Sequence, residues 1–142
     1  MSAAHILVVD DEADIRSTIS DILTDEGYAV TVAGDAADAR REVQRAAPDL
    51  ILLDVWMPDI DGITLLREWT DAGTPDCPVV ILSGHGTVET AVEATRLGAV
   101  DFVEKPLSLA KLLRTVRKAL EGTRRTHQVR AGRRQRRESL AP

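Results

Sequence analysis

Five side chains that could do chemistry closely follow short apolar runs of the chain. Asp10 and Asp11 follow the first run, Asp54 the third, Ser83 the fourth and Lys105 the fifth. Capping alone explains Asp10 and Asp11 as well as a binding role does, since Asp commonly ends strands and begins helices. All five residues, in this order, are better explained by one common site.

Neighbouring carboxylates need a cation, because each one otherwise raises the pKa of the others. Asp10, Asp11 and Asp54 offer only oxygen ligands, and no His or Cys belongs to the set. Oxygen ligands suit a hard ion, so the predicted cofactor is Mg²⁺ rather than zinc.

The apolar runs themselves predict strands. They contain four or five residues, are rich in aliphatic and β-branched side chains, and are bounded by Asp, Gly or Pro. Such runs are typical of strands buried on both faces of a parallel sheet. The predicted strands are His5–Val9, Ala29–Val32, Leu50–Leu53, Val79–Leu82 and Val100–Val103.

Segments with helical periodicity lie between and after these runs. The first, within Glu12–Glu26, places Ile15, Ile19, Ile22 and Leu23 on one stripe. The others are Ala36–Ala46, Ile63–Ala72, Val88–Leu97 and about Leu109–Leu120. Glycine is predicted to end four of the helices, at Gly27, Gly73, Gly98 and Gly122, and Pro48 closes the second.

Strict alternation of five strands and five helices predicts a doubly wound α/β domain. Right-handed crossovers leave few topologies, and the flavodoxin-like order 2-1-3-4-5 is the natural one for five parallel strands. Ligands of such sheets bind beyond the carboxyl ends of the strands, where the order reverses. The five site residues are therefore expected to converge on one pocket.

The motifs around these residues resemble the receiver domain of bacterial two-component response regulators. The matching segments are ILVVDDE at 6–12, PDLILLDVWMPDIDG at 48–62, VVILSGHG at 79–86 and GAVDFVEKPL at 98–107. Together they span essentially all of residues 5–121. The resemblance implies the (βα)5 receiver fold and a signalling switch that is controlled by phosphorylation.

The resemblance also implies a role for each site residue. Asp54 is the expected phosphoacceptor. Mg²⁺ is expected on Asp10, Asp11, Asp54 and the main-chain carbonyl of Trp56. Ser83 and Lys105 are expected to contact the phosphoryl oxygens. Phosphoryl transfer needs mainly positioning and charge neutralisation, which such groups supply. The chain would thus catalyse its own phosphorylation and a slow self-dephosphorylation.

Further residues are expected to carry the signal. Ser83 would move toward the phosphoryl group and vacate space for Phe102, which is the two-state element of the family. Trp56 and His85, two positions past Asp54 and Ser83, are expected to flank the path of the hydrolytic water and to set the phosphoryl lifetime. The Lys105–Pro106 peptide bond is expected to be cis.

Other protein classes fit less well. A haloacid-dehalogenase-type phosphatase needs a second Asp two residues after the nucleophile, where Trp56 stands. A nucleotide-binding module needs a glycine-rich loop after the first strand, and Asp10-Asp11-Glu12 would repel phosphates there. A receiver that only binds partners would lack part of the acidic set or the lysine, and both are present.

The charge pattern divides the chain into a receiver domain at 1–121 and an Arg-rich linker or tail at 122–142. The first part has 11 Lys and Arg against 22 Asp and Glu, whereas the second has seven Arg against one Glu. The acidic part is a poor nucleic-acid binder by itself. The sequence shows no signal peptide, no membrane span and a single cysteine, Cys77, so a cytoplasmic protein is expected.

Segment 83–106 most resembles receivers of nitrogen-regulation-type σ54-dependent transcription activators. Output is therefore expected to be transcriptional, with DNA contacted only through domains absent from this chain. The alternative is a stand-alone regulator in a phosphorelay without DNA-binding output. The expected partners are a sensor histidine kinase and a second copy of the receiver after phosphorylation, through the face of the fourth helix, fifth strand and fifth helix.

Overall fold

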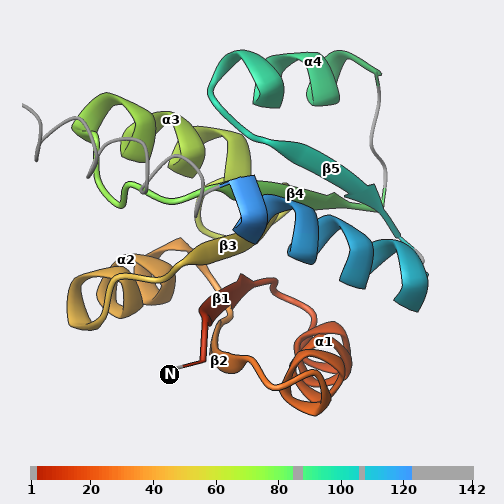
Figure 1. The fold of residues 1–142 in the computed structure, drawn as a ribbon. Helices are drawn as coiled ribbons and strands as arrows, with labels where there is room; N and C mark the ends of the chain where they lie inside the picture. Colours follow the sequence, from red (N-terminus) through yellow and green to blue (C-terminus); the bar gives the residue numbers. More distant parts are fainter. Residues whose placement is uncertain (1–2, 85–87, 106–107, 123–142) are drawn as a thin grey trace, which may run out of the picture.

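The structure is a computed structural model that describes residues 3–84, 88–105 and 108–122. Strands and helices alternate along the chain (Figure 1). They are β1 (His5–Val9), α1 (Ala13–Asp25), β2 (Ala29–Ala33), α2 (Ala36–Arg45), β3 (Leu50–Asp54), α3 (Gly62–Ala72), β4 (Val79–Ser83), α4 (Val88–Arg96), β5 (Asp101–Glu104) and a last helix at 109–122.

The five strands form one parallel sheet in the order β2-β1-β3-β4-β5, as predicted. The order reverses beside β1, because the chain first moves outward to β2 and then returns to β3 on the other side. β1 and β3 are therefore neighbours, in register from Ile6 with Leu50 to Val9 with Leu53. This pairing brings the residues after both strands to the same edge of the sheet.

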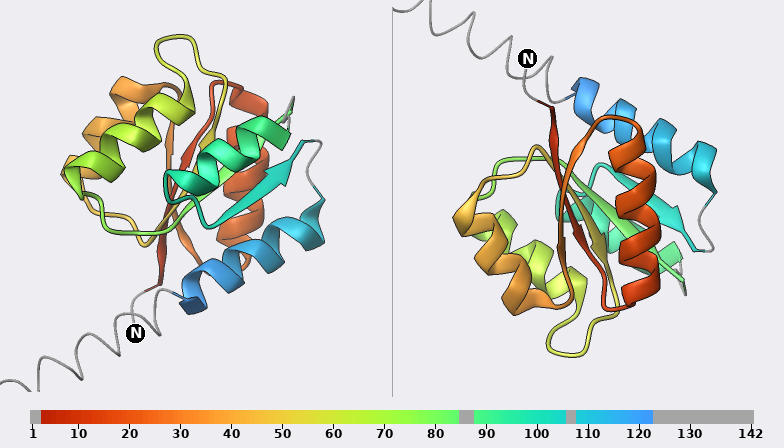
Figure 2. Two further views of the ribbon diagram at one scale, coloured as in Figure 1. Left: turned by 90° about the horizontal axis from the view of Figure 1, so that it is seen from above. Right: turned by 90° about the horizontal axis from the view of Figure 1, so that it is seen from below.

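Helices cover both faces of the sheet (Figure 2). Alternate strand residues point to opposite faces, so Leu50 and Leu52 pack against α1 and the last helix, while Ile51 and Leu53 pack against α2, α3 and α4. The two apolar layers fix the sheet between the helices. Burial of both faces explains why the central strands are almost entirely aliphatic.

The prediction that all five strands are buried on both faces is wrong for β2 and β5. Both lie at edges of the sheet, so each has a neighbouring strand on one side only. Val32 in β2 is 41% exposed, and the ends of β5 are exposed as well. The last strand also begins one residue later than predicted, because Val100 lies outside it and is exposed.

Helix ends follow local chemistry. The predicted stops Gly27, Gly73 and Gly98 have φ values of 91°, 73° and 103°, a left-handed conformation that only glycine adopts easily. At two helix starts, Asp35 and Asp61 accept hydrogen bonds from the main-chain N–H three residues on. These caps set where α2 and α3 begin.

Candidate functional site

The structure brings all five side chains of the predicted pocket to the carboxyl edge of the sheet, with Asp11 next to Asp10. Asp10 follows β1, Asp54 and Ser83 end β3 and β4, and Lys105 follows β5. The first three are almost completely buried, with 0%, 3% and 1% of their surface exposed. Buried charged groups need partners, so their contacts show what the site is built to hold.

Lys105 is the centre of these contacts. Its Nζ lies 2.7 Å from Asp10 Oδ2, 3.6 Å from Asp54 Oδ1 and 3.5 Å from Glu12 Oε1. The lysine side chain is 10% exposed. Burial lowers the pKa of Lys105, but its ion pairs with the three carboxylates outweigh burial, so the net shift is upward and the ammonium stays charged.

The carboxylates repel one another despite this cation. Burial and then the charge of Asp10 raise the pKa of Asp54 to about 7, with a further contribution from the neighbouring Asp11. Lys105 opposes these effects without cancelling them. One lysine therefore does not neutralise the acidic site, which leaves a demand for a further positive charge.

The donor atoms fit a magnesium ion. Carboxylate oxygens of Asp10, Asp11 and Glu12 lie within 4.8 Å of one another, and Asp54 adjoins them. The side chains of Asp11 and Glu12 are exposed, so an ion can reach them from solvent. Mg²⁺ binds a few carboxylates and keeps several waters, which suits an open, all-oxygen site of this kind. The main-chain carbonyl of Trp56 remains a predicted ligand.

Ser83 offers a donor at the same place. Its hydroxyl is buried and has no hydrogen-bond partner among the described residues. Gly84 follows it, and a Cβ there would lie 3.7 Å from the Lys105 side chain. A buried hydroxyl without a partner is costly unless a ligand completes it, so Ser83 is available to an incoming group.

The remaining predicted residues are placed differently. Phe102 lies in β5 beside Ile81 of β4, and it is partly buried against the core cluster under α2, α3 and α4. The Trp56 side chain is 58% exposed in the segment after β3. His85 and the Lys105–Pro106 bond lie outside the described residues.

Gly62 is a site residue that sequence reasoning missed. A Cβ at Gly62 would lie 2.1 Å from the carbonyl oxygen of Asp54, and its N–H donates to the carbonyl of Val55 at 2.7 Å. The start of α3 therefore rests directly on the main chain of Asp54. The Asp-Gly pair at 61–62 marks a helix start, but its approach to Asp54 depends on the path of the loop between them.

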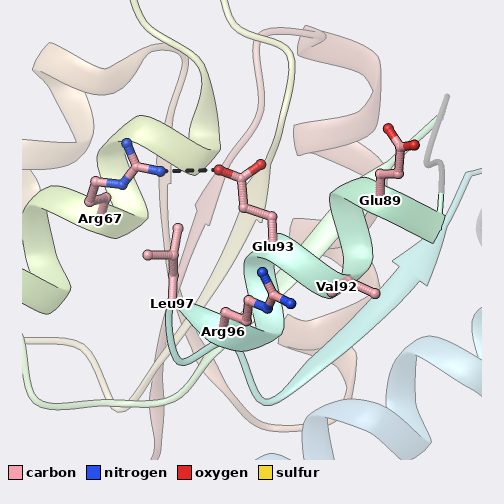
Figure 3. Close-up of a pocket in the computed structure, with 6 residues that line it drawn as sticks. All are labelled: Arg67, Glu89, Val92, Glu93, Arg96 and Leu97. Carbon is pink, nitrogen blue, oxygen red and sulfur yellow. Dashed lines mark hydrogen bonds and ion pairs between the residues drawn. The ribbon is translucent and has the colours of Figure 1, made fainter.

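The structure also has a groove that is separate from this site. A groove of about 520 Å³ between α3 and α4 is lined by Arg67, Glu89, Val92, Glu93, Arg96 and Leu97 (Figure 3). Arg67 and Glu93 form an ion pair across it at 3.1 Å. None of the predicted site residues lines this groove. The candidate site therefore remains the acidic edge of the sheet, where those residues meet.

Comparison with known proteins agrees with this geometry. The sequence profile of the response regulator receiver domain matches residues 6–117. The chain belongs to this family. The resemblance of its motifs to receiver domains is thus confirmed, as is the flavodoxin-like five-stranded order.

Receiver domains of nitrogen regulators are among its relatives. The chain is 44% identical over 130 residues to the nitrogen assimilation regulatory protein NtrX of Azorhizobium caulinodans, covering 90% of this chain and 28% of that protein. A crystal structure of NtrX from Brucella abortus in complex with ADP superimposes with a TM-score of 0.85 at 45% identity, covering 92% of this chain and 29% of that one. The chain thus spans less than a third of these relatives.

A third relative is a receiver alone. The solution structure of the beryllofluoride-activated NtrC4 receiver domain dimer matches with a TM-score of 0.78 and 40% identity, over 84% of this chain and 98% of that one. The likeness to nitrogen-regulation-type receivers is therefore confirmed.

Among the described residues, no helix is both long and apolar enough to cross a membrane.

Proposed function

We propose that this receiver domain is a signalling switch in which Asp54 accepts a phosphoryl group with the help of Mg²⁺. The observation that supports this most is the placement of the buried Asp54 carboxylate, 3.6 Å from the ammonium of Lys105 and beside Asp10 and Asp11. A carboxylate so placed is a nucleophile with charge-neutralising groups around it.

The transfer is a displacement at phosphorus. An oxygen of Asp54 forms the new O–P bond while the bond from phosphorus to its donor breaks in line with it. With a phosphohistidine donor the leaving group is the kinase imidazole, which takes up a proton. Lys105 is close enough to Asp54 to pair with the transferred oxygens. Asp10, Asp11 and Asp54 would hold Mg²⁺, which would supply neutralisation of the negative charge that develops there.

Ser83 and Phe102 are proposed to convert the new group into a conformational signal. The unpartnered Ser83 hydroxyl can donate to a phosphoryl oxygen, and the movement toward it frees space next to β5. Phe102 is only partly buried and pairs with Ile81 in β4, so it can turn inward into that space. Phosphorylation then biases a two-state side chain on the outer strand.

The change at Phe102 in β5 is proposed to produce the output of the switch. The surface formed by α4, β5 and the last helix would pair with a second copy after phosphorylation, and the NtrC4 receiver dimer supports this by likeness. A sensor histidine kinase is the proposed donor. Transcriptional output would lie in domains outside this chain, since the NtrX relative is much longer. A stand-alone phosphorelay regulator remains the second candidate.

Intact mass after incubation with acetyl phosphate tests the proposal. With Mg²⁺, we expect the wild-type chain to gain one phosphoryl mass, and chelation with EDTA should prevent it. Asp54→Asn should gain none under the same conditions. Asp71→Asn removes an exposed carboxylate on α3 and serves as the matched control, which should be labelled like the wild type. Labelling of Asp54→Asn would show that another residue is the acceptor.

A further inference from the structure

We propose that Arg16 is the positioning residue of the metal site, because it holds the main chain of Asp10 in the conformation that presents the carboxylates to Mg²⁺. This inference rests on the proposed function and adds a residue to it. Arg16 lies in the first half of α1 and is half-buried.

The contact is direct. Nη1 of Arg16 donates to the main-chain carbonyl of Asp10 over 2.6 Å. Asp10 follows the last residue of β1, where the ladder to β3 has ended at Val9 and Leu53. The N–H of Asp10 still donates to Ala33 at 3.1 Å. The carbonyl of Asp10, a completely buried residue, therefore accepts its hydrogen bond from the side chain of Arg16, which carries a positive charge.

The same turn carries the metal ligands. Asp10 Oδ1 accepts a hydrogen bond from the N–H of Glu12 at 2.9 Å, which closes the turn between β1 and α1. Asp10, Asp11 and Glu12 thus lie on a segment whose like charges push it apart. Arg16 ties the first residue of this segment to α1, so the carboxylates are already arranged when a cation arrives.

Gly34 makes room for this guanidinium. A Cβ at Gly34 would lie 3.1 Å from Nη1 and 3.5 Å from Cζ of Arg16. Unlike Gly27, Gly73 and Gly98, Gly34 has no positive φ, so its backbone conformation does not itself require glycine. The small residue at the turn after β2 is better explained by the space that Arg16 occupies.

The charge of Arg16 also reaches beyond Asp10. The pKa of Asp38 in α2 is lowered, mainly by its hydrogen bond to Arg41 and in small part by the charge of Arg16. Arg16 therefore stands between the turns that follow β1 and β2. It can hold the metal-binding turn against a second, fixed part of the fold.

Magnesium affinity of the full chain tests this role. Titration with Mg²⁺ alone, followed by calorimetry or by tryptophan fluorescence, should give a Kd for each variant. Removing a residue that orients metal ligands typically weakens binding about 10–100-fold, and Arg16→Ala should fall in this range. Arg117→Ala is the matched control, because Arg117 pairs with Glu26 at the far end of α1. Its Kd should equal that of the wild type.

A double-mutant cycle separates positioning from a general loss of structure. Gly34→Ala should weaken Mg²⁺ binding in the wild type, since its Cβ displaces the guanidinium, and should have no effect on Kd when Arg16 is already Ala. Independent effects of the two changes would overturn the proposal. So would an unchanged Kd of Arg16→Ala in a wild type that binds Mg²⁺. Absence of Mg²⁺ binding by the wild type would instead overturn the proposed function, and this inference with it.

Discussion

At the scale of single residues, Asp54 meets two opposing demands. A nucleophilic carboxylate must be ionised, yet burial and neighbouring acids raise its pKa to about 7. Lys105 offsets part of this effect at 3.6 Å. A divalent cation would offset the remaining repulsion between the carboxylates. Without it, this repulsion destabilises the folded chain. Such a cost is common where groups are arranged for function rather than for stability.

This cost predicts a pH-dependent gain in stability for Asp54→Asn. Asp in an unfolded chain has a pKa of about 3.9, so the folded chain binds more protons between about pH 4 and 7. The contribution of Asp54 to the free energy of unfolding therefore falls as the pH rises through this range. At pH 8, without divalent cations, Asp54→Asn should be more stable than the wild type by about 1–3 kcal/mol.

Urea unfolding in EDTA at pH 5 and pH 8 measures this difference. The advantage of Asp54→Asn should shrink at pH 5, where Asp54 of the wild type is mostly protonated. Asp71→Asn, at an exposed position of α3, should show no such pH dependence. An equal advantage of Asp54→Asn at both pH values would mean that its charge is not the cause.

Trp56 is expected to affect how long the phosphoryl group stays on Asp54. Its ring is 58% exposed two residues past Asp54. We propose that it covers the approach of a hydrolytic water. Excluding that water by about 1.4 kcal/mol slows hydrolysis tenfold. Trp56→Asn should therefore lose its phosphoryl group faster than the wild type, measured as decay after removal of the donor. Equal or slower decay would show that the Trp56 ring does not shield the phosphoryl group from water.

At the scale of elements, the segment between β3 and α3 is fixed at several points. The Asp59 carboxylate accepts hydrogen bonds from the N–H groups of Ala36 and Ala37, both at 3.1 Å. Asp61 caps α3 through Thr64, and Gly62 rests on the main chain of Asp54. The segment is thus held to the start of α2 and to the end of β3, and these contacts fix the shape of the loop beside the candidate site.

Gly62→Ala tests how closely this segment is fitted. The new Cβ would meet main-chain atoms, which cannot move aside as a flexible side chain does. We expect the free energy of unfolding to fall by about 1–3 kcal/mol in chemical denaturation. Gly84→Ala is the comparison, since its Cβ would make only an ordinary contact at 3.7 Å and should cost less than about 1 kcal/mol. Equal losses would show that the approach to Asp54 is not the limiting contact.

Elements were more predictable than their contacts. Periodicity and glycine stops place the starts of all five predicted helices, and the ends of the first four, within a residue or two of the structure. Burial and capping act over a few neighbouring residues, which makes these bounds predictable. Exposure of β2 and β5 was not predictable from their composition, since it depends on their position in the sheet. The approach of Arg16 to Asp10 and Gly34 was not predictable for the same reason. Arg16 lies in α1 and Gly34 follows β2, so their proximity depends on how the chain folds.

For the molecule as a whole, we expect phosphorylation to change its self-association. Phe102 lies on the outer strand of the sheet, so a rotation there alters the surface of α4, β5 and the last helix. Sedimentation velocity with beryllofluoride and Mg²⁺ should shift the wild type toward a dimer, and Asp54→Asn should stay unchanged. A wild type that remains monomeric at high concentration would remove dimerisation as the output and favour the phosphorelay candidate.

Chemical trapping identifies the residue that forms the acyl phosphate, which we propose is Asp54. Borohydride reduces an aspartyl phosphate to homoserine, so peptide mapping after reduction identifies the modified position. After treatment with acetyl phosphate and Mg²⁺, we expect homoserine at position 54 and at no other aspartate, with none formed in EDTA. Homoserine at Asp10, Asp11 or another carboxylate, or unmodified Asp54 in a chain that has gained phosphoryl mass, would contradict it.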